Sequence, residues 1–538
     1  MLVLASLGSW LPFAIVAILI VLFSLIFTSR YQQKRKRDYL VTVICSISLI
    51  IALLTASLLP TDVILVSFMK NSDGTFKDWT QNQTTRDDIQ HYVEIGYYVL
   101  YSLVIAMAFL VNPFLFFYYE EKEEGEKISK RICSAIKWTA GFLIFLVVLL
   151  VLGIFVPQLA SLPSDNSTSE WENVKYLVNH FDNPSKIEAI RSVTLHVKQN
   201  TIIIGFFLLT VYTGYGSIAC PLTLIRGKRS ARLQHEAIEE QRAANRAQIQ
   251  AIKDRYPRHV SMPSREKRKL EDLEQKELVL SRNEESIKIV RRSFFFKCRY
   301  IYRPTQIVFG VLLLLLALLI FVSLLLSNIN KCIHFVDFKQ IFAQGNKTLP
   351  NPIDIVLTWT GKVYPANYIV LSLLLVYIIF TSVFGLQQLG IWYFCVRMYR
   401  FSRGRTKPQA ILMLCSFMMF IVVAINVFVY LLIPQYSIYG DQHYAVKEHD
   451  GTMVVKPCTQ YVTTDQCQMT VMGRIILRFF YKVWFFGAVY FCLSWLFLLM
   501  FVVSSLVKII RSRESNIQEF SVERLLESDE DEDAPLIQ

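Results

Sequence analysis

The feature that most constrains the fold of this chain is a series of nine apolar runs, each at least 20 residues long. A helix needs about 20 apolar residues to cross the hydrocarbon core of a bilayer, which is about 30 Å thick. The runs cover residues 9–29, 41–60, 94–118, 138–157, 200–224, 305–327, 366–394, 409–433 and 484–508. They predict an all-α, polytopic membrane protein with nine transmembrane helices.

Composition excludes the two main alternatives. Of the 538 residues, 53% are hydrophobic and 18% are charged, and the mean hydropathy is +0.38. A soluble chain of several domains carries about 25% charged residues, and a disordered chain is far less apolar.

The first run indicates the orientation. No charged residue precedes it, and Arg30 and the basic cluster at 34–37 follow it. A cleaved signal peptide carries its positive charge before a shorter apolar core. We therefore expect a retained anchor with a lumenal N-terminus, and nine spans then place the C-terminus in the cytosol.

Charge placement agrees with this topology. The predicted cytosolic segments hold 40 of the 56 Lys and Arg residues, as cytoplasmic loops of membrane proteins do. The net charge of +13 is therefore a topology signal, and it does not indicate a nucleic-acid partner.

The loops predicted to be lumenal contain glycosylation sequons and a cysteine pair, which are typical of lumenal segments. Asn82, Asn166 and Asn346 each begin an Asn-x-Ser/Thr sequon, so we predict them as glycosylation sites. Cys458 and Cys467 lie nine residues apart in the polar loop 434–482, and an oxidising compartment favours a disulfide between them. Cys332 is a third lumenal cysteine, with no mate that the sequence identifies.

The chain divides into four predicted segments: 1–225 with five spans, 226–303 in the cytosol, 304–508 with four spans, and an acidic tail at 509–538. Segment 226–303 has two charged helical stretches separated by Pro257 and Pro263, which predicts a helical hairpin. It carries 21 basic and 11 acidic residues. It is either a solvated hairpin that follows the positive-inside bias or a docking surface for anionic headgroups or a partner protein.

The tail contains a candidate sorting signal. Glu532, Leu536 and Ile537 fit the acidic dileucine pattern that clathrin adaptors bind. Ser528 precedes an acidic run and is a candidate phosphorylation site. The alternative is an unmodified, solubilising tail.

No enzyme motif is present, neither a zinc-protease, a nucleophile-elbow nor a phosphate-loop pattern, so we predict no catalytic residues. The eight His show no metal-ligand spacing, so we predict no metal site. Arg474, Arg478 and Lys482 share one helix face. That face would meet an anionic ligand or partner, or lie on lipid headgroups.

Several stretches together resemble one family. They are residues 58–67, 74–79, 96–102, 116–122, 166–172, 404–410 and 434–440, which include Leu-Leu-Pro-Thr-Asp-Val, Gly-Thr-Phe-Lys-Asp-Trp and Pro-Gln-Tyr-Ser-Ile-Tyr-Gly. The chain is similar, from about residue 10 to about residue 500, to the limb-region-like membrane protein family and to its lysosomal members that escort cobalamin transport.

The resemblance implies a nine-span lysosomal membrane protein that takes part in exporting cobalamin (vitamin B12) to the cytosol. Cobalamin is then a transported ligand, and no covalently bound cofactor is expected. The implied partner is an ATP-binding-cassette transporter. The residues themselves predict two further partners, membrane lipids and a clathrin adaptor that binds the tail. They also predict passage through the endoplasmic reticulum and plasma membrane. Two alternatives remain open at this point: an endocytic receptor or adaptor at the plasma membrane, and a self-sufficient cobalamin transporter.

Overall fold

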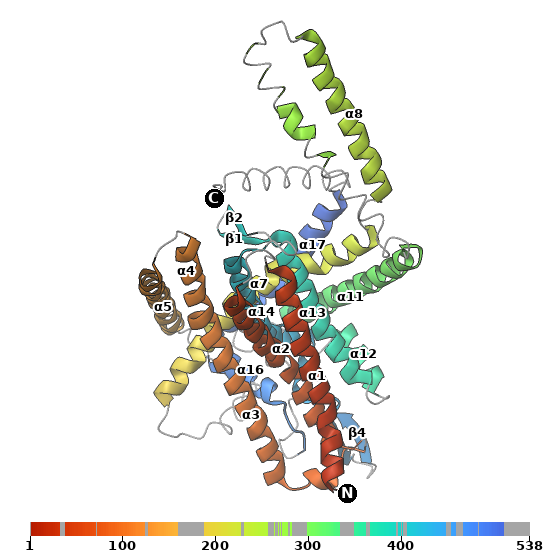
Figure 1. Ribbon diagram of the computed structural model, residues 1–538. Helices are drawn as coiled ribbons and strands as arrows, with labels where there is room; N and C mark the ends of the chain where they lie inside the picture. The colour runs from red at the N-terminus through yellow and green to blue at the C-terminus, as the bar shows by residue number, and fades with distance from the viewer. Residues whose placement is uncertain are drawn as a thin grey trace. The chain divides into compact units, whose positions relative to one another are not determined.

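The computed structural model describes most of the chain. The described residues are 2–32, 38–71, 73–123, 127–159, 188–226, 231–256, 263, 267, 270, 272–277, 280–281, 299–333, 349–361, 366–393, 396–399, 401, 406–447, 453–458, 466–482 and 484–510. They are mostly helical (Figure 1).

The helices are α1 (Leu2–Tyr31), α2 (Tyr39–Phe68), η1 (Asp78–Thr80), α3 (Gln83–Ala106), η2 (Met107–Val111), α4 (Asn112–Glu123), α5 (Ile128–Leu159), α7 (Glu188–Arg226), α8 (Ala231–Arg255), α11 (Arg299–Ile333), α12 (Pro352–Gly361), α13 (Ala366–Leu389), α14 (Pro408–Leu432), α15 (Pro434–Tyr439), α16 (Val471–Lys482) and α17 (Trp484–Ile510). The strands are β1 (Ile391–Tyr393), β2 (Val396–Tyr399), β3 (His443–Lys447) and β4 (Met453–Pro457).

Seven helices in the described part of the chain are long and apolar enough to cross a membrane. They are Tyr39–Phe68, Gln83–Lys122, Thr201–Ile225, Pro304–Ile333, Ala366–Leu389, Pro408–Leu432 and Gly487–Lys508. The other two apolar runs, 9–29 and 138–157, lie within the helices α1 and α5. That these two also cross the membrane stays a prediction.

The chain divides into two compact units. One comprises Met1–Ile218 and Leu316–Ser504, and the other comprises Ala219–Leu315 and Ser505–Gln538. The first holds the bulk of the helical bundle, and the second holds α8.

Helix α14 forms the core of the first unit. Its 25 residues are apolar almost throughout, and nearly all of them are buried. Lys407 lies at its N-cap with Pro408 in the first turn, and Pro434 begins the next helix. A helix that is hydrophobic on all sides is stable only when other elements surround it, and α2, α4 and α13 pack against α14 (Figure 1).

The predicted span 94–118 lies in a longer helical segment. Helices α3 and α4 are continuous through η2, a π-helical turn at Met107–Val111. Directly after this turn, the buried Asn112 accepts a hydrogen bond from Ser48 Oγ of α2 at 3.2 Å.

The expectation of an all-α chain was wrong in two places. β1 and β2 form one antiparallel pair, and β3 and β4 form another (Figure 1). The run predicted at 366–394 is helical only to Leu389, because Gly390 has φ 73° and turns the chain into β1. Hydropathy cannot separate an apolar strand from the end of an apolar helix.

Candidate functional site

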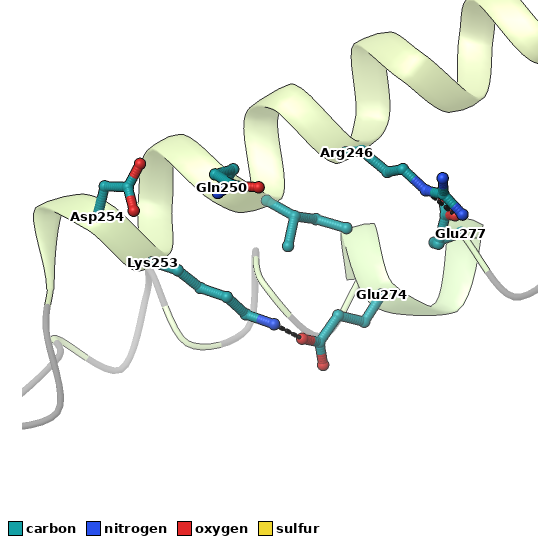
Figure 2. Close-up of a pocket in the computed structure, with 7 residues that line it drawn as sticks. Arg246, Gln250, Lys253, Asp254, Glu274 and Glu277 are labelled. Carbon is teal, nitrogen blue, oxygen red and sulfur yellow. Dashed lines mark hydrogen bonds and ion pairs between the residues drawn. The ribbon is translucent and has the colours of Figure 1, made fainter.

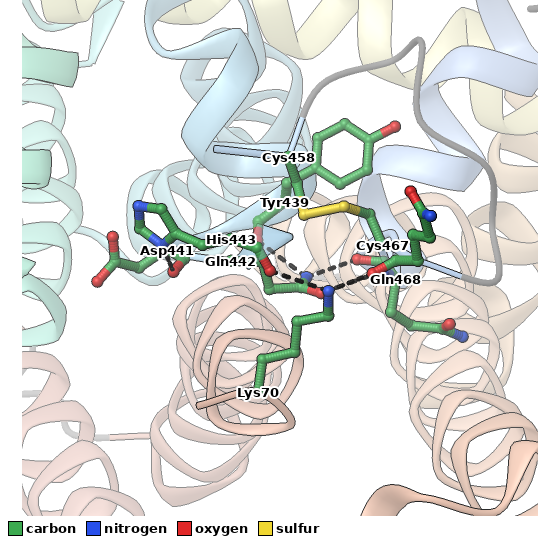
Figure 3. Close-up of a disulfide and its surroundings, with 9 residues drawn as sticks. Lys70, Tyr439, Asp441, Gln442, His443, Cys458, Cys467 and Gln468 are labelled. Atoms are coloured by element: carbon green, nitrogen blue, oxygen red, sulfur yellow. Dashed lines mark hydrogen bonds between the residues drawn. A yellow bond between two sulfur atoms is a disulfide. The ribbon is translucent and has the colours of Figure 1, made fainter. Parts of the chain in front are cut away.

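The described part of residues 434–482 folds into what we call the disulfide module, which comprises α15, β3, β4 and α16 with their connections. A disulfide joins Cys458 and Cys467, whose Cα atoms lie 6.0 Å apart (Figure 3). The disulfide predicted from sequence is therefore present, and both cysteines are buried.

Gln442 connects the two sides of this disulfide. Its Nε2 donates to Gln468 O at 2.7 Å, and Gln468 N donates back to Gln442 Oε1 at 3.1 Å (Figure 3). Its carbonyl oxygen accepts a hydrogen bond from Cys458 N at 2.9 Å. The side chain and the backbone carbonyl of one buried residue thus bind the segments on both sides of the cystine.

Lys70, which lies just after α2, bonds two carbonyl oxygens of the disulfide module. Its Nζ donates to His443 O at 2.9 Å and also to Gln466 O (Figure 3). The residue is 6% exposed. Burial, and secondly the charge of Arg86, lower the pKa of Lys70 to about 8. The ammonium therefore stays protonated, and able to donate, at neutral and acidic pH.

The loop between α2 and α3 encloses this lysine. Two cations lie over the Phe76 ring: Lys70 Nζ is 4.8 Å and the Arg86 guanidinium carbon 4.1 Å from its centroid. Arg86 also donates to Thr80 O at 2.9 Å. Gly74, with φ 85°, packs against the backbone of β3, where a Cβ would lie 2.8 Å from Ala445 N.

Asp62 holds the module from within the bundle. This carboxylate lies in α2 and is 1% exposed. It accepts hydrogen bonds from Val471 N at 3.2 Å and Met472 N at 2.8 Å, the first two residues of α16. A helix N-terminus carries unpaired N–H groups and a partial positive charge, which a carboxylate stabilises.

One turn further along α16, Arg474 donates to the Gln90 side chain of α3. Gln90 Nε2 in turn donates to Met469 O at 2.9 Å. Arg474, one of three residues of the predicted basic face, thus bonds within the protein. The side chains of Arg478 and Lys482 lie outside the described part of the chain.

Asp441 and His443 lie at the edge of the module. Asp441 N donates to Ser67 Oγ at 3.1 Å. His443 Nδ1 lies 3.1 Å from Asp441 O (Figure 3). Burial raises the pKa of the Asp441 carboxyl, and the charge of His443 partly opposes that rise.

The second unit contains a separate groove. Helix α8 lies beside the short helical segment 272–277, and the groove between them has a volume of about 440 Å³ (Figure 2). Two ion pairs cross it, Arg246–Glu277 at 2.6 Å and Lys253–Glu274 at 2.7 Å. Burial alone would raise the pKa of Glu277, but hydrogen bonds from Arg242 and Arg246 hold it below its usual range.

The predicted modification sites fall in different parts of the chain. Asn82 is exposed and lies immediately before α3. Cys332 is an exposed free thiol near the end of α11. Six of the predicted site residues lie outside the described part of the chain: Asn166, Asn346, Ser528, Glu532, Leu536 and Ile537. Among the described residues, no group of three His, Cys, Asp or Glu side chains could hold a metal ion.

Comparison with known proteins places this architecture in a family. The family model described as LMBR1-like membrane protein matches residues 9–295, more than half of the chain. The chain belongs to the LMBR1-like membrane protein family. No solved structure matches it.

Curated relatives of this LMBR1-like membrane protein match over nearly their whole length. A protein of Nematostella vectensis named "Probable lysosomal cobalamin transporter" is 35% identical over 95% of both chains. The "Lysosomal cobalamin transport escort protein LMBD1" of Gallus gallus is 36% identical over 95% of both chains. The human protein of that name is 35% identical over 95% of this chain and 94% of its own. These names describe transport or escort and not an enzyme.

Sequence reasoning missed the residues that hold the disulfide module of this LMBR1-like protein. Lys70 and Gln466 lie 396 residues apart, and Asp62 and Met472 lie 410 apart. One signal was available for Asp62. The helix that contains it extends to Phe68, beyond the predicted run 41–60, and a carboxylate within a spanning helix is a functional candidate by default.

Proposed function

We propose that this chain is a lysosomal membrane escort required for the export of cobalamin from the lysosome to the cytosol. It acts on an ATP-binding-cassette transporter, which supplies the energy. Cobalamin is the cargo of the pair, and the chain itself catalyses no reaction.

The observation that carries this proposal is the extent of the match. The escort proteins of chicken and human align with about 95% of this chain. A match confined to one segment would support only a shared fold element. A match along the whole chain supports a shared function.

The proposal includes the topology. Nine spans, with the N-terminus in the lumen and the C-terminus in the cytosol, place Asn82, Asn166, Asn346 and the disulfide module in the lumen. Segment 226–303 is then a cytosolic helical hairpin. Glu532, Leu536 and Ile537 form a sorting signal for a clathrin adaptor, and phosphorylation of Ser528 adds negative charge beside it.

In this arrangement the disulfide module is a rigid lumenal platform. Asp62 and Lys70 anchor it to α2, and Gln90 anchors it to α3. An escort must present a stable surface to its transporter, and a cystine with buried hydrogen bonds provides one in an acidic, proteolytic compartment.

The test uses cells in which the gene for this chain is disrupted. We expect free cobalamin to accumulate in lysosomes and both cofactor forms of cobalamin to fall. Re-expression of the wild-type chain should restore both quantities. A normal distribution of cobalamin in the disrupted cells would refute the proposal.

A second experiment separates an escort from a transporter. The purified chain, the transporter, or both are reconstituted into liposomes loaded with labelled cobalamin and supplied with ATP. An escort gives no flux alone and increases the amount or lifetime of active transporter. Flux from the chain alone would make it a self-sufficient carrier.

A further inference from the structure

Helix α12 has an apolar face that is largely exposed. Ile353 and Leu357 are buried against the protein, whereas Ile355 is 55% exposed and Trp359 is 70% exposed. Val356 adds to the exposed face, and the one charged residue of the helix, Asp354, is half-buried. At 10 residues, about 15 Å, the helix is too short to span a bilayer.

The N-terminal end of α12 is held at the boundary of the bundle. Asn351, 7% exposed, donates to Leu432 O at 2.6 Å, the carbonyl of the last residue of the spanning helix α14. Its Oδ1 accepts a hydrogen bond from Ser323 Oγ of α11 and one from Ile353 N at 3.1 Å. A single buried amide thus caps α12 and ties it to two other helices.

The C-terminal end is held at the same boundary. A Cβ on Gly361 would lie 2.6 Å from a carboxylate oxygen of Asp441, so the two residues are in close contact. Asp441 N in turn donates to Ser67, in the last turn of the spanning helix α2. The N-terminal end of α12 therefore lies at the end of α14, and its C-terminal end lies at the end of α2.

We propose that α12 is an interfacial helix that lies in the bilayer leaflet on the side of the disulfide module, with Ile355, Val356 and Trp359 in contact with lipid. Because spanning helices end at both ends of α12, the helix is placed at the boundary between headgroups and acyl chains. Trp side chains concentrate at this boundary in membrane proteins. Helix α13, which packs against α12, also exposes apolar side chains, Ile369 and Leu373. The proposal concerns the membrane contact of the chain and does not depend on the identity of its cargo.

Trp fluorescence tests this placement in full-length protein reconstituted into phosphatidylcholine nanodiscs. Trp359→Phe removes one of eight Trp residues, so the difference from wild type reports Trp359 alone. In the Trp359→Phe background, Ile355→Trp reports a second position on the same face. Val455→Trp, at an exposed site on β4, is the matched control outside the spanning helices.

Lipids with brominated acyl chains should quench the emission from positions 359 and 355 at least about twofold more than the emission from position 455. Aqueous iodide should give the reverse order. Equal quenching by brominated lipid at all three positions would overturn the proposal. Protection of positions 359 and 355 from both quenchers would also overturn it, because a second copy of the chain would then cover the face.

Discussion

Lys70 is a charged side chain in a buried position, and its surroundings explain how the fold tolerates it. Its ammonium bonds two carbonyl oxygens, His443 O and Gln466 O, and lies over the Phe76 ring. Burial lowers the pKa of Lys70 to about 8, which shows that the charge is only partly compensated. The two hydrogen bonds of Lys70 connect the end of α2 directly to both sides of the disulfide module.

We expect Lys70→Met to lower the free energy of unfolding by about 1–3 kcal/mol, because it leaves two carbonyl oxygens without their donor. Thermal unfolding in detergent measures the loss. Lys77→Met is the matched control, since Lys77 Nζ only lies over the Phe68 ring at 3.4 Å, a contact worth about 0.5–1 kcal/mol. Equal losses for both variants would contradict the role assigned to Lys70.

Asp441 should make stability depend on pH. Burial raises its folded-state pKa, so its contribution is full below the ordinary value of about 3.9 and is lost as pH rises through the raised value. We expect Asp441→Asn to gain stability relative to wild type as pH rises from about 4 to 7, as measured by thermal unfolding at each pH.

Asp73→Asn is the control of opposite sign. Hydrogen bonds from Thr75 lower the pKa of Asp73, so its contribution is present above the ordinary value and lost as pH falls. This variant should lose stability relative to wild type as pH rises through the acid range to about 5, and the difference should then stay constant. The same trend in both variants would refute the assignment to Asp441.

At the scale of elements, Asp62 couples α2 to the start of α16. We expect Asp62→Ala to destabilise by about 1–3 kcal/mol for each of the two N–H groups that it leaves without an acceptor. Asp62→Asn should cost less, since an amide oxygen still accepts one bond. Thermal unfolding and the protease sensitivity of the disulfide module measure how much stability each variant loses. A smaller loss for Asp62→Ala than for Asp62→Asn would contradict the role assigned to Asp62.

Helices α7 and α13 cross closely enough for backbone to touch backbone. A Cβ on Gly216 would collide with Thr381 O, and a Cβ on Gly385 would collide with Tyr212 O. Gly216→Ala should therefore destabilise by about 1–3 kcal/mol, the usual cost of overpacking. Gly96→Ala is the control, because nothing lies within 4 Å of its added methyl group. Comparable thermal unfolding of the two variants would argue against the close crossing.

These elements show what sequence reasoning could and could not reach. Apolar runs predict helices because the burial pattern is local in the chain, and the Cys458–Cys467 pair was within reach because only nine residues separate its members. The contacts of Asp62 and Lys70 depend on segments about 400 residues away, and no local pattern encodes them. The strands β3 and β4 lie in a polar loop, where the hydropathy signal is weakest.

For the whole molecule, the distribution of charge is the strongest argument for orientation. The segments predicted to be cytosolic hold 40 of the 56 basic residues. Short loops rich in Lys and Arg resist translocation, so this asymmetry should govern how the chain inserts. The described structure provides reporters on both predicted sides: Asn82 and Cys332 on one, and Cys133 on the other, all exposed.

We expect Asn82→Gln to remove one glycan, seen as a faster-migrating band that glycosidase treatment equalises with wild type. In intact lysosomes, a membrane-impermeant maleimide should label Cys133 at the start of α5. It should label Cys332 only after permeabilisation, because the proposed topology places the end of α11 in the lumen. Peptide mapping assigns each label. Labelling of Cys332 in intact lysosomes with protection of Cys133 would invert the topology, and the disulfide module would then lie in a reducing compartment where its cystine would not persist.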